Sequence, residues 1–357
     1  MLGAEMITET TGNLLAADAD ALVNTVNTEG VMGKGIALQF KKAYPAMYDA
    51  YRRAAKSGEV HLGSMHVWPT GQMTCPRYII NFPTKGHWKS RSRLKDIESG
   101  LLDLVKTIAE LRITSIALPP LGCGNGGLKW TDVHPRIVEA FKELPDVHVL
   151  LFAPGPPPSA ADMPTATARP SMTPGRAALV EILNLYTRQT SMTPGLIESQ
   201  KLMYFLQEAG EPLRLQYAAN RYGPYADNLR HVLSLIEGHF LSGFGDGSAP
   251  VSEAEALAVL PGAPEMAERV LAQAQDTRMR IDRVLELASG FESSYGLELL
   301  ATVHWLATRE QPTSDEVLIH QLQDWSPRKA RMFTPEHIRF ALTTLRDRQW
   351  LPAVAPA

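Results

Sequence analysis

The chain has 357 residues, of which 45% are hydrophobic and 20% charged, and this balance indicates a folded protein of about two domains, not a disordered or fibrous chain. No run approaches the roughly 20 apolar residues of a membrane span, so no membrane partner is expected. The formal net charge of −3 excludes a strongly basic nucleic-acid-binding protein and leaves only local contacts with DNA. Two cysteines, Cys75 and Cys123, are too few for a disulfide framework, which favours a reducing cytoplasm.

The first half of the chain alternates strand and helix signals. Short, mostly apolar runs predict strands at residues 21–26, 61–69, 77–83, 115–119 and 148–153. Helical patterns lie between them at 35–56, 93–111 and 131–144. This alternation predicts an α/β sandwich whose sheet is covered by helices on both faces.

A segment poor in large apolar side chains separates the two halves. Residues 154–175 consist mainly of Pro, Ala, Ser and Thr, and such a composition cannot bury enough surface to fold. We therefore predict domains at residues 1–155 and 176–357, joined by a linker at 156–175. Residues 1–155 carry 17 Lys and Arg against 15 Asp and Glu, whereas the remainder carries 18 against 23.

The second half contains helical patterns and no convincing strand. Thr193 and Thr334, each followed by Pro, predict helix starts, and Gly210 predicts the end of the first of these helices. Its apolar residues between 196 and 206 are expected to lie largely on one face. The pentapeptide Ser-Met-Thr-Pro-Gly occurs at 171–175 and again at 191–195, which we interpret as coincidence and not as a structural repeat.

Two glycine-rich loops carry the densest chemical signal. The first reads VNTVNTEGVMGKGIA at residues 23–37 and leads from a strand into a helix that starts near Gly35, where helix-start amides can bind phosphate. It is not a P-loop, because no Ser or Thr follows Lys34, and its GxxGxG spacing is not the Rossmann fingerprint. The second reads PPLGCGNGGL at 119–128. Either loop alone fits a tight turn, but two of them at strand ends favour an elongated phosphorylated ligand.

The two loops, in this order, resemble those of macrodomains, which are ADP-ribose-binding α/β/α sandwiches with a mixed sheet. The resemblance covers about residues 7–153, and the segment NFPTK at 81–85 is similar to the catalytic segment of the DarG antitoxins. In that family the macrodomain removes ADP-ribose that the DarT toxin attaches to thymine in single-stranded DNA. The resemblance therefore implies a DNA ADP-ribosyl glycohydrolase without a cofactor, whose partners are ADP-ribose, ADP-ribosylated single-stranded DNA and DarT.

The resemblance also implies site residues. Lys85 is the implied catalytic residue, either as a nucleophile at the ribose C1 atom or as a positive charge, and the sequence leaves both roles open. Asn27 would hold the distal ribose, and Asn13 stands where macrodomains usually carry an Asp that contacts adenine. The implied ADP-ribose-binding residues are Asn13, Leu14, Asn27, Met32, Gly33, Lys34, Gly35, Ile36, Thr84, Gly122, Cys123, Gly124, Asn125 and Gly126.

The chain departs from a related group of enzymes in the second loop. Terminal ADP-ribose glycohydrolases pair their Lys with an Asp there, and Gly126 stands at that position in this chain, so no Lys–Asp pair is expected. A thymine imide anion is delocalised and leaves readily, which makes an acid at this position less necessary. Cys123 has no His at a partner spacing and is interpreted as a small packing residue. The histidines form no cluster that predicts a metal site.

Beside Lys85 lie further residues with two interpretations. His87 and Trp88 would stack an unpaired base at the rim of the site, or they are packed rim aromatics. The basic residues between 85 and 95 would guide a DNA strand, or they form an ordinary solvated face.

The helical half resembles known antitoxin domains more weakly. DarG proteins carry a C-terminal domain that binds and blocks DarT, which implies a toxin-binding domain at 176–357, and the segments QKLMYF at 200–205 and RYGPY at 221–225 are similar to a helical antitoxin module. The acidic balance of this half would suit a competitor for the DNA groove of DarT, or it is an ordinary acidic surface. Two other functions compete with hydrolysis of modified DNA: a non-catalytic ADP-ribose reader, and a hydrolase of protein-linked ADP-ribose.

Overall fold

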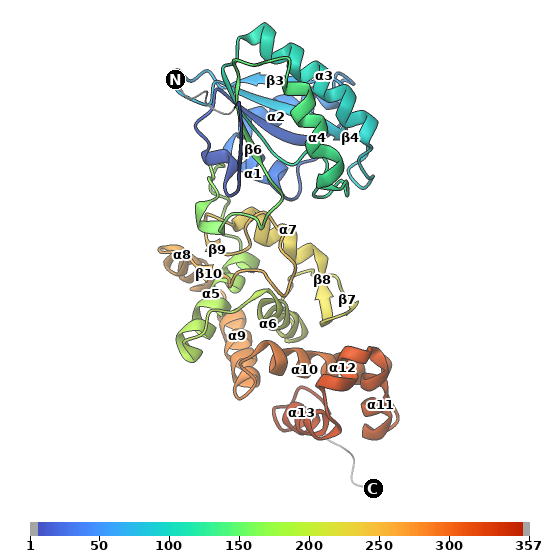
Figure 1. Cartoon of the computed structure of the whole chain (residues 1–357). Coiled ribbons are helices and arrows are strands. Elements are labelled where there is room, and N and C mark those ends of the chain that lie inside the picture. Colours follow the sequence, from blue (N-terminus) through green and yellow to red (C-terminus); the bar gives the residue numbers. More distant parts are fainter. Residues whose placement is uncertain (1–5, 353–357) are drawn as a thin grey trace. The chain divides into compact units, whose positions relative to one another are not determined.

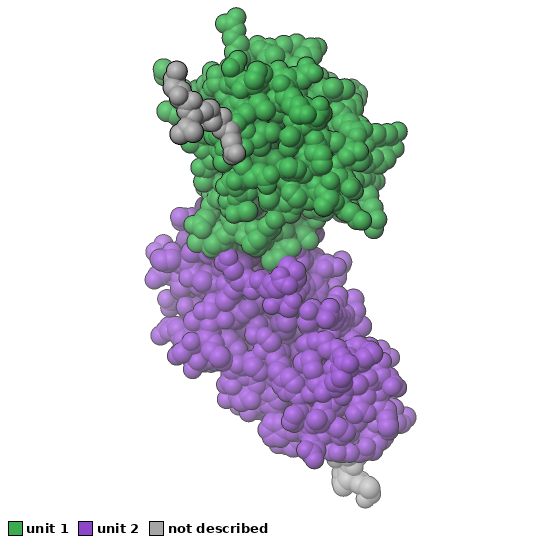
Figure 2. Space-filling view, in the orientation of Figure 1, with its two compact units in different colours: residues 1–168, 245–249 green, residues 169–244, 250–357 purple. Residues whose placement is uncertain are grey.

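The computed structural model describes residues 6–352 and contains two compact units. The first comprises residues 1–168 and 245–249, and the second comprises residues 169–244 and 250–357 (Figure 2). Among the described residues, no helix is both long and apolar enough to cross a membrane.

A six-stranded mixed sheet forms the centre of the first unit (Figure 1). Its strand order is β1-β6-β5-β2-β4-β3, in which β3 alone runs antiparallel to its neighbour. The strands are β1 (Ile7–Thr10), β2 (Ala21–Asn27), β3 (His66–Pro69), β4 (Tyr78–Lys85), β5 (Ser115–Leu118) and β6 (His148–Phe152). The neighbouring strands β2 and β4 therefore end at the same edge of the sheet, where the two glycine-rich loops also begin.

Helices cover both faces of this sheet. They are α1 (Ile36–Ala43), α2 (Pro45–Lys56), α3 (Leu94–Leu111) and α4 (Trp130–Phe141), with short 3₁₀ helices at η1 (Leu14–Ala16) and η2 (Ala160–Asp162). The first pair buries Phe40, Met47 and Tyr51 against one sheet face, and the second pair packs a separate apolar cluster on the opposite face. The prediction of an α/β/α sandwich with a mixed sheet is confirmed.

The predicted elements of this unit need three corrections. Residues 35–56 form two helices and not one, because Pro45 lacks the amide that would continue α1 and instead starts α2. The strand predicted from residue 61 begins only at His66, after a turn in which Gly63 has a φ of +82°. The strand β1 was not predicted, because its sequence ITET alternates and has little apolar character.

The second unit is built mainly of helices around one apolar core. Its helices are α5 (Pro174–Thr190), α6 (Leu196–Glu208), α7 (Asp227–Ile236), α8 (Ala263–Leu271), α9 (Gln275–Ala288), α10 (Ser294–Trp305), the π-helical η3 (Leu306–Glu310), α11 (Asp315–Trp325), α12 (Pro327–Met332) and α13 (Pro335–Asp347). The central helix α6 contacts α5, α9 and α10. Nine of the 13 residues of α6 are buried, including Ser199, Gln200 and Lys201, and the other four are half-buried, so the expectation of a single apolar face on this helix was wrong.

One of the two predicted helix starts is confirmed. The Thr334 hydroxyl accepts a hydrogen bond from the amide of His337 and caps α13. Thr193 does not cap α6, which begins at Leu196 with Gly195 in the cap position. The carbonyl of Pro194 accepts a hydrogen bond from the amide of Leu257 instead of starting the helix. The predicted helix end is close to the observed one, since α6 ends two residues before Gly210.

The second unit also contains short strands, which corrects the expectation that it has none. They are β7 (Tyr217–Asn220), β8 (Gly223–Ala226), β9 (Leu241–Ser242) and β10 (Ala258–Val259). The two motifs singled out in the sequence meet here, because the Lys201 amine donates to the carbonyl of Pro224 over 2.7 Å and the Gln200 side chain pairs with the backbone of Ala226. The motif residues thus anchor the β7–β8 hairpin on α6.

Candidate active site

The first glycine-rich loop is held in shape by Asn27, the last residue of β2. Its side-chain nitrogen donates to the carbonyl of Val31 over 2.6 Å, and its side-chain oxygen accepts from the amide of Glu29 at 3.0 Å. The hydroxyl of buried Tyr51 donates to the backbone carbonyl of Asn27. Asn27 therefore closes the turn that leads into the loop, and Tyr51 is a supporting residue that the sequence pattern did not indicate.

Met32 fastens the middle of this loop to the sheet. It is buried, and its sulfur lies 3.9 Å from the side-chain nitrogen of Asn24, which donates to the side-chain oxygen of Asn81 over 2.8 Å. Gly33 and Lys34 are exposed, whereas Gly35 is buried and Ile36 half-buried. The exposed part of the loop is therefore short and lies directly before α1.

The start of α1 is contacted by residue 246, which belongs to the first unit although it comes late in the chain. Gly35, with a φ of +64°, donates its amide to the carbonyl of Asp246 over 3.1 Å. The Asp246 carboxylate accepts from the side-chain nitrogen of Gln39, one turn further along the helix, at 2.6 Å. Both side chains are buried, so Asp246 completes the helix end at the first loop. The sequence offered no signal for this contact.

The second loop is tightly wound around Gly122 and Gly126. Gly122 has a φ of +71° and its carbonyl accepts from the amide of Leu128, while the carbonyl of Gly126 accepts from the amide of Ser92. A β-carbon at Gly126 would lie 2.3 Å from the Ser92 hydroxyl oxygen and 2.4 Å from the Gly122 carbonyl oxygen. Only glycine therefore fits at position 126, which excludes an acidic side chain there in this loop geometry.

Lys85 lies where the two loops approach each other. It is the last residue of β4, and in the register of the sheet it is opposite Asn27. Its amine donates to the backbone carbonyl of Asn125 over 3.1 Å, and burial lowers the pKa of Lys85 below its ordinary value of 10.5. A β-carbon at Gly35 would lie 3.3 Å from the side-chain nitrogen of Asn125. Asn125 thus lies between the amine and the first loop.

Three of the implied ADP-ribose-binding residues lie outside this junction. The side-chain oxygen of Asn13 caps η1 by accepting from Leu15, and its nitrogen donates to the carbonyl of Asp162. Leu14 is buried in the apolar cluster beside α1 and α2. The Thr84 hydroxyl donates to the carbonyl of Val26 between strands and is buried. These contacts stabilise the protein around the site.

Cys123 of the second loop is half-buried between two glycines. Burial, together with the negative charge of Asp132, raises the pKa of the thiol to about 11. At neutral pH the thiol is therefore protonated and a poor nucleophile. Gly124 and Asn125, which follow it, are exposed at the surface of the loop.

Comparisons with known proteins agree with this architecture. A family model described as Macro domain matches residues 23–137. A DNA ADP-ribosyl glycohydrolase of Thermus aquaticus is 47% identical over 337 residues, which are 94% of this chain and 92% of the relative. The chain belongs to the DarG family of DNA ADP-ribosyl glycohydrolases. A solved macrodomain of Mycobacterium tuberculosis DarG is 57% identical, covering 43% of this chain and all of that one, with a TM-score of 0.42.

A further relative of this family joins two activities in one chain. It is a DNA ADP-ribosyl transferase–DNA ADP-ribosyl glycohydrolase fusion protein of Thermosipho africanus. It is 32% identical over 158 residues, which are 40% of each chain.

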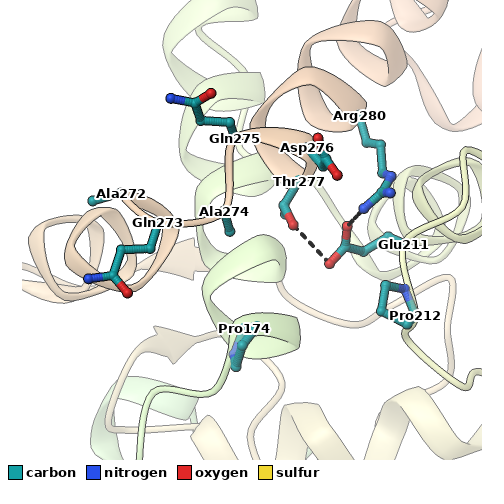
Figure 3. A pocket seen from close by; sticks show the side chains of 10 residues that line it. All are labelled: Pro174, Glu211, Pro212, Ala272, Gln273, Ala274, Gln275, Asp276, Thr277 and Arg280. Carbon is teal, nitrogen blue, oxygen red and sulfur yellow. Dashed lines mark hydrogen bonds and ion pairs between the residues drawn. The ribbon is translucent and has the colours of Figure 1, made fainter.

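A separate open pocket lies in the second unit of this glycohydrolase (Figure 3). Its volume is about 540 Å³, and the carboxylate of Glu211 lies in its wall, where it accepts from the Thr277 hydroxyl at 3.1 Å and from Arg280 at 2.8 Å. Because Arg280 neutralises Glu211, the pocket offers no unpaired buried charge to a ligand at this point. Within residues 6–352 no group of three or more His, Cys, Asp or Glu side chains is arranged to hold a metal ion.

Proposed function

We propose that this glycohydrolase cleaves the N-glycosidic bond between ADP-ribose and thymine in single-stranded DNA and so reverses the modification made by DarT. The observation that carries the proposal is the position of Lys85, whose amine lies at the junction of two glycine-rich loops and has a lowered pKa. The extent of the likeness to the Thermus aquaticus glycohydrolase supports the same reaction.

The two loops bind the ADP-ribose. The exposed backbone at Gly33 and Lys34 faces the diphosphate, and the second loop from Gly122 to Gly126 encloses the ribose next to thymine. Asn27 shapes the turn that receives the distal ribose, and Asn13 lies at the adenine end. Gly124 and Asn125 are exposed and can contact the ligand directly, whereas the buried Leu14, Met32 and Thr84 support the loops. The other residues of the implied set are Gly35, Ile36 and Cys123.

The reaction proceeds through Lys85 as a nucleophile. Its neutral amine attacks C1 of the ribose while the bond from C1 to thymine N3 breaks, and the electron pair leaves with N3 as a delocalised imide anion. The lysine nitrogen bonded to C1 is now a secondary ammonium group and keeps both of its protons, while the imide takes up a proton from water and leaves hydroxide. Water then adds to C1, the C1–N bond breaks with its electron pair on nitrogen, and Lys85 leaves as a neutral amine. The added water loses a proton to the hydroxide, which completes the release of ADP-ribose.

The lowered pKa of Lys85 supports this role over that of a fixed positive charge. An unperturbed lysine is neutral in fewer than about one molecule in a thousand at pH 7. Each unit by which burial lowers the pKa gives about ten times more neutral amine. Since position 126 admits only glycine, no carboxylate at that position of the second loop stabilises the charged form of Lys85.

A release assay on defined substrates tests this function. The full chain is incubated with a single-stranded oligonucleotide that carries ADP-ribose on thymine and, separately, with a protein that carries ADP-ribose on glutamate. Release from the DNA and not from the protein is expected, and it should vanish in Lys85→Ala. Release from the protein alone would indicate a hydrolase of protein-linked ADP-ribose. Binding of ADP-ribose without release from either substrate would indicate a non-catalytic ADP-ribose reader.

We further propose that the second unit binds DarT. The Thermosipho africanus fusion protein supports a partnership between a DNA ADP-ribosyl transferase and a glycohydrolase, since both lie in one chain. Acidic residues are exposed along one stretch of this unit and would compete with DNA for the basic groove of a DNA-binding toxin. They are Glu253, Glu255, Glu265, Glu268 and Asp276.

Calorimetry with purified DarT tests the second proposal. The full chain should form a complex, and a variant with Glu253, Glu265 and Asp276 changed to Lys should bind at least tenfold more weakly. A fragment of residues 1–168 should not bind. Equal binding by the fragment and the full chain would place the toxin contact on the macrodomain instead.

A further inference from the structure

The turn directly after Lys85 presents an exposed aromatic surface. Trp88 is 46% exposed, although tryptophan is usually well buried in folded proteins. Its ring stacks on that of His87, with centroids 5.6 Å apart and planes inclined by 23°. The Lys89 amine lies 4.8 Å from the centroid of the Trp88 ring. Two aromatic rings and a cation thus form one layered surface.

This turn is fixed to the active site and is not a free loop. The carbonyl of Gly86 accepts from the amide of Thr28 at 3.1 Å, which ties the turn to the residue after Asn27. The amide of Ser90 donates to the carbonyl of His87 over 2.9 Å and closes the turn. The orientation of the aromatic rings is therefore coupled to that of the first glycine-rich loop.

Each nitrogen of the His87 ring has a polar neighbour. Its Nδ1 atom accepts from the amide of Lys89 at 3.1 Å, and its Nε2 atom lies 3.6 Å from the carboxylate of Glu29 in the first loop. Because Nδ1 accepts a hydrogen bond, the proton of the neutral ring is on Nε2, facing Glu29. His87 is therefore hydrogen-bonded at one nitrogen and close to Glu29 at the other, while its ring stacks on Trp88.

Exposed cations surround this surface. Lys89, Arg91 and Lys95 are exposed, and none of them forms an ion pair with an acidic side chain of the described residues. Arg93, by contrast, is paired with Asp96 at 2.8 Å. Cations of this kind beside an exposed aromatic ring are the combination that binds single-stranded nucleic acid, because the ring stacks a base and the cations contact phosphates.

We propose that Trp88, supported by His87, stacks the base adjacent to the ADP-ribosylated thymine. The exposed Lys89 side chain then turns from the Trp88 ring to the phosphate of that nucleotide, which Arg91 also contacts. This inference rests on the proposed function of Lys85. Trp88 follows Lys85 by three residues, which separates their Cα atoms by at most about 11 Å. The Trp88 ring and the Lys85 amine are therefore at the same end of β4, where a base next to the bound thymine would also lie. The enzyme should therefore bind an ADP-ribosylated oligonucleotide more tightly than an ADP-ribosylated mononucleotide, which has no neighbouring base.

Kinetics on two substrates of different length test the proposal in the full chain. One is an ADP-ribosylated thymidine mononucleotide, and the other is a single-stranded oligonucleotide of about ten nucleotides with one ADP-ribosylated thymine. For Trp88→Ala we expect KM on the oligonucleotide to rise about 5- to 100-fold, as is usual when a stacking aromatic is removed. Its kcat, and both constants on the mononucleotide, should stay unchanged. Trp88→Phe should restore most of the affinity.

A matched control removes an exposed apolar side chain away from this turn. Leu102, in α3, is 76% exposed, and Leu102→Ala should leave KM on both substrates unchanged. The double change Lys89→Ala and Arg91→Ala should reduce the dependence of oligonucleotide binding on salt. The slope of log K against log salt should become shallower by about 0.7 for each phosphate that the variant no longer binds.

The outcomes separate this inference from the proposed function. If wild type releases ADP-ribose from neither substrate, the proposed function fails. Fluorescence anisotropy with a labelled unmodified oligonucleotide then compares the DNA affinity of wild type and Trp88→Ala, and a weaker affinity in the variant supports the inference. If Trp88→Ala raises KM equally on both substrates, or on neither, Trp88 does not stack a neighbouring base and the inference is overturned. A strong effect on ADP-ribosylated protein alone would identify a protein surface instead.

Discussion

The amine of Lys85 lies 3.1 Å from the backbone carbonyl oxygen of Asn125, so the last residue of β4 is held by the second glycine-rich loop. This hydrogen bond joins the proposed nucleophile to the loop that we propose encloses the ribose. It also orients the amine before substrate binds, and a carbonyl accepts a hydrogen bond both from a neutral amine and from an ammonium group. The hydrogen bond therefore positions the Lys85 amine in both its neutral and its protonated form.

The proposed role of Lys85 predicts a pH profile. Because burial lowers its pKa below 10.5, the fraction of neutral amine rises with pH until the pH passes that pKa. We expect kcat/KM for release from DNA to rise about tenfold per pH unit in the acidic limb and then to level off. Stopped release assays between pH 6 and pH 10 measure this profile.

Two substitutions complete that experiment. Lys85→Ala should lose release while keeping ADP-ribose binding in calorimetry. Lys85→Arg keeps the positive charge but offers no nucleophilic amine, so it should be as inactive as Lys85→Ala. Substantial turnover in Lys85→Arg would show that a charge is sufficient.

The fit of Gly126 against Ser92 predicts an unusual sensitivity to a single methyl group. In Gly126→Ala the β-carbon meets the backbone carbonyl of Gly122 at 2.4 Å, so the loop must shift. We expect ADP-ribose affinity to fall at least tenfold and the melting temperature to decrease. Gly124→Ala is the matched control for stability, since a β-carbon there meets nothing within 4 Å and should leave the melting temperature unchanged.

The contact between Asp246 and Gln39 predicts a loss of stability when it is broken. Asp246→Ala leaves the buried side-chain nitrogen of Gln39 without its acceptor at 2.6 Å, which should cost about 1–3 kcal/mol in the free energy of unfolding. Asp246→Asn retains one oxygen and should lose less. The exposed Asp146→Ala serves as the control in urea denaturation, and an equal effect of both alanine variants would contradict the prediction.

The buried Lys201 predicts a stability that depends on pH. Burial lowers the pKa of Lys201 to about 7, against the attraction of Glu298 and with the repulsion of Lys329. Between pH 7 and pH 10.5 the unfolded chain binds a proton that the folded chain does not, so this lysine makes the second unit more stable as pH rises.

Denaturation at two pH values measures this effect. From pH 7 to pH 9 the contribution amounts to about 2–3 kcal/mol in the free energy of unfolding. Lys201→Met should therefore gain less stability than wild type over this range, whereas the exposed Lys106→Met should follow wild type. An identical pH dependence in Lys201→Met and wild type would exclude the effect.

The sequence predicted the layers of the first unit because its central strands are short and apolar. It did not predict β1, whose pairing with β6 lies at the edge of the sheet. In the second half it missed the β7–β8 hairpin, since each strand has only four residues and Pro224 interrupts the second. Thr193 carries the same local signal as Thr334, yet only Thr334 caps its helix. The residue after Thr193 has a backbone contact with Leu257, which no local pattern contains.

Only part of the candidate site has a signal in the sequence. The glycine-rich loops and Lys85 stand out because their chemistry is local in the sequence. Tyr51, Ser92 and Asp246 support that chemistry from distant positions, through hydrogen bonds and close packing that have no sequence signature. Asn13 and Thr84 were predicted as ligand contacts, and the hydrogen bonds seen for them are to the protein itself.

The docking of Asp246 at Gly35 has a practical consequence for how this macrodomain is isolated. A gene fragment that ends after residue 168 encodes both glycine-rich loops and Lys85, yet it omits the carboxylate that Gln39 needs and the carbonyl that Gly35 needs. In such a fragment Gly35 and Gln39 would lose these two partners, so the properties of the loop before α1 would be those of the fragment and not of the intact chain.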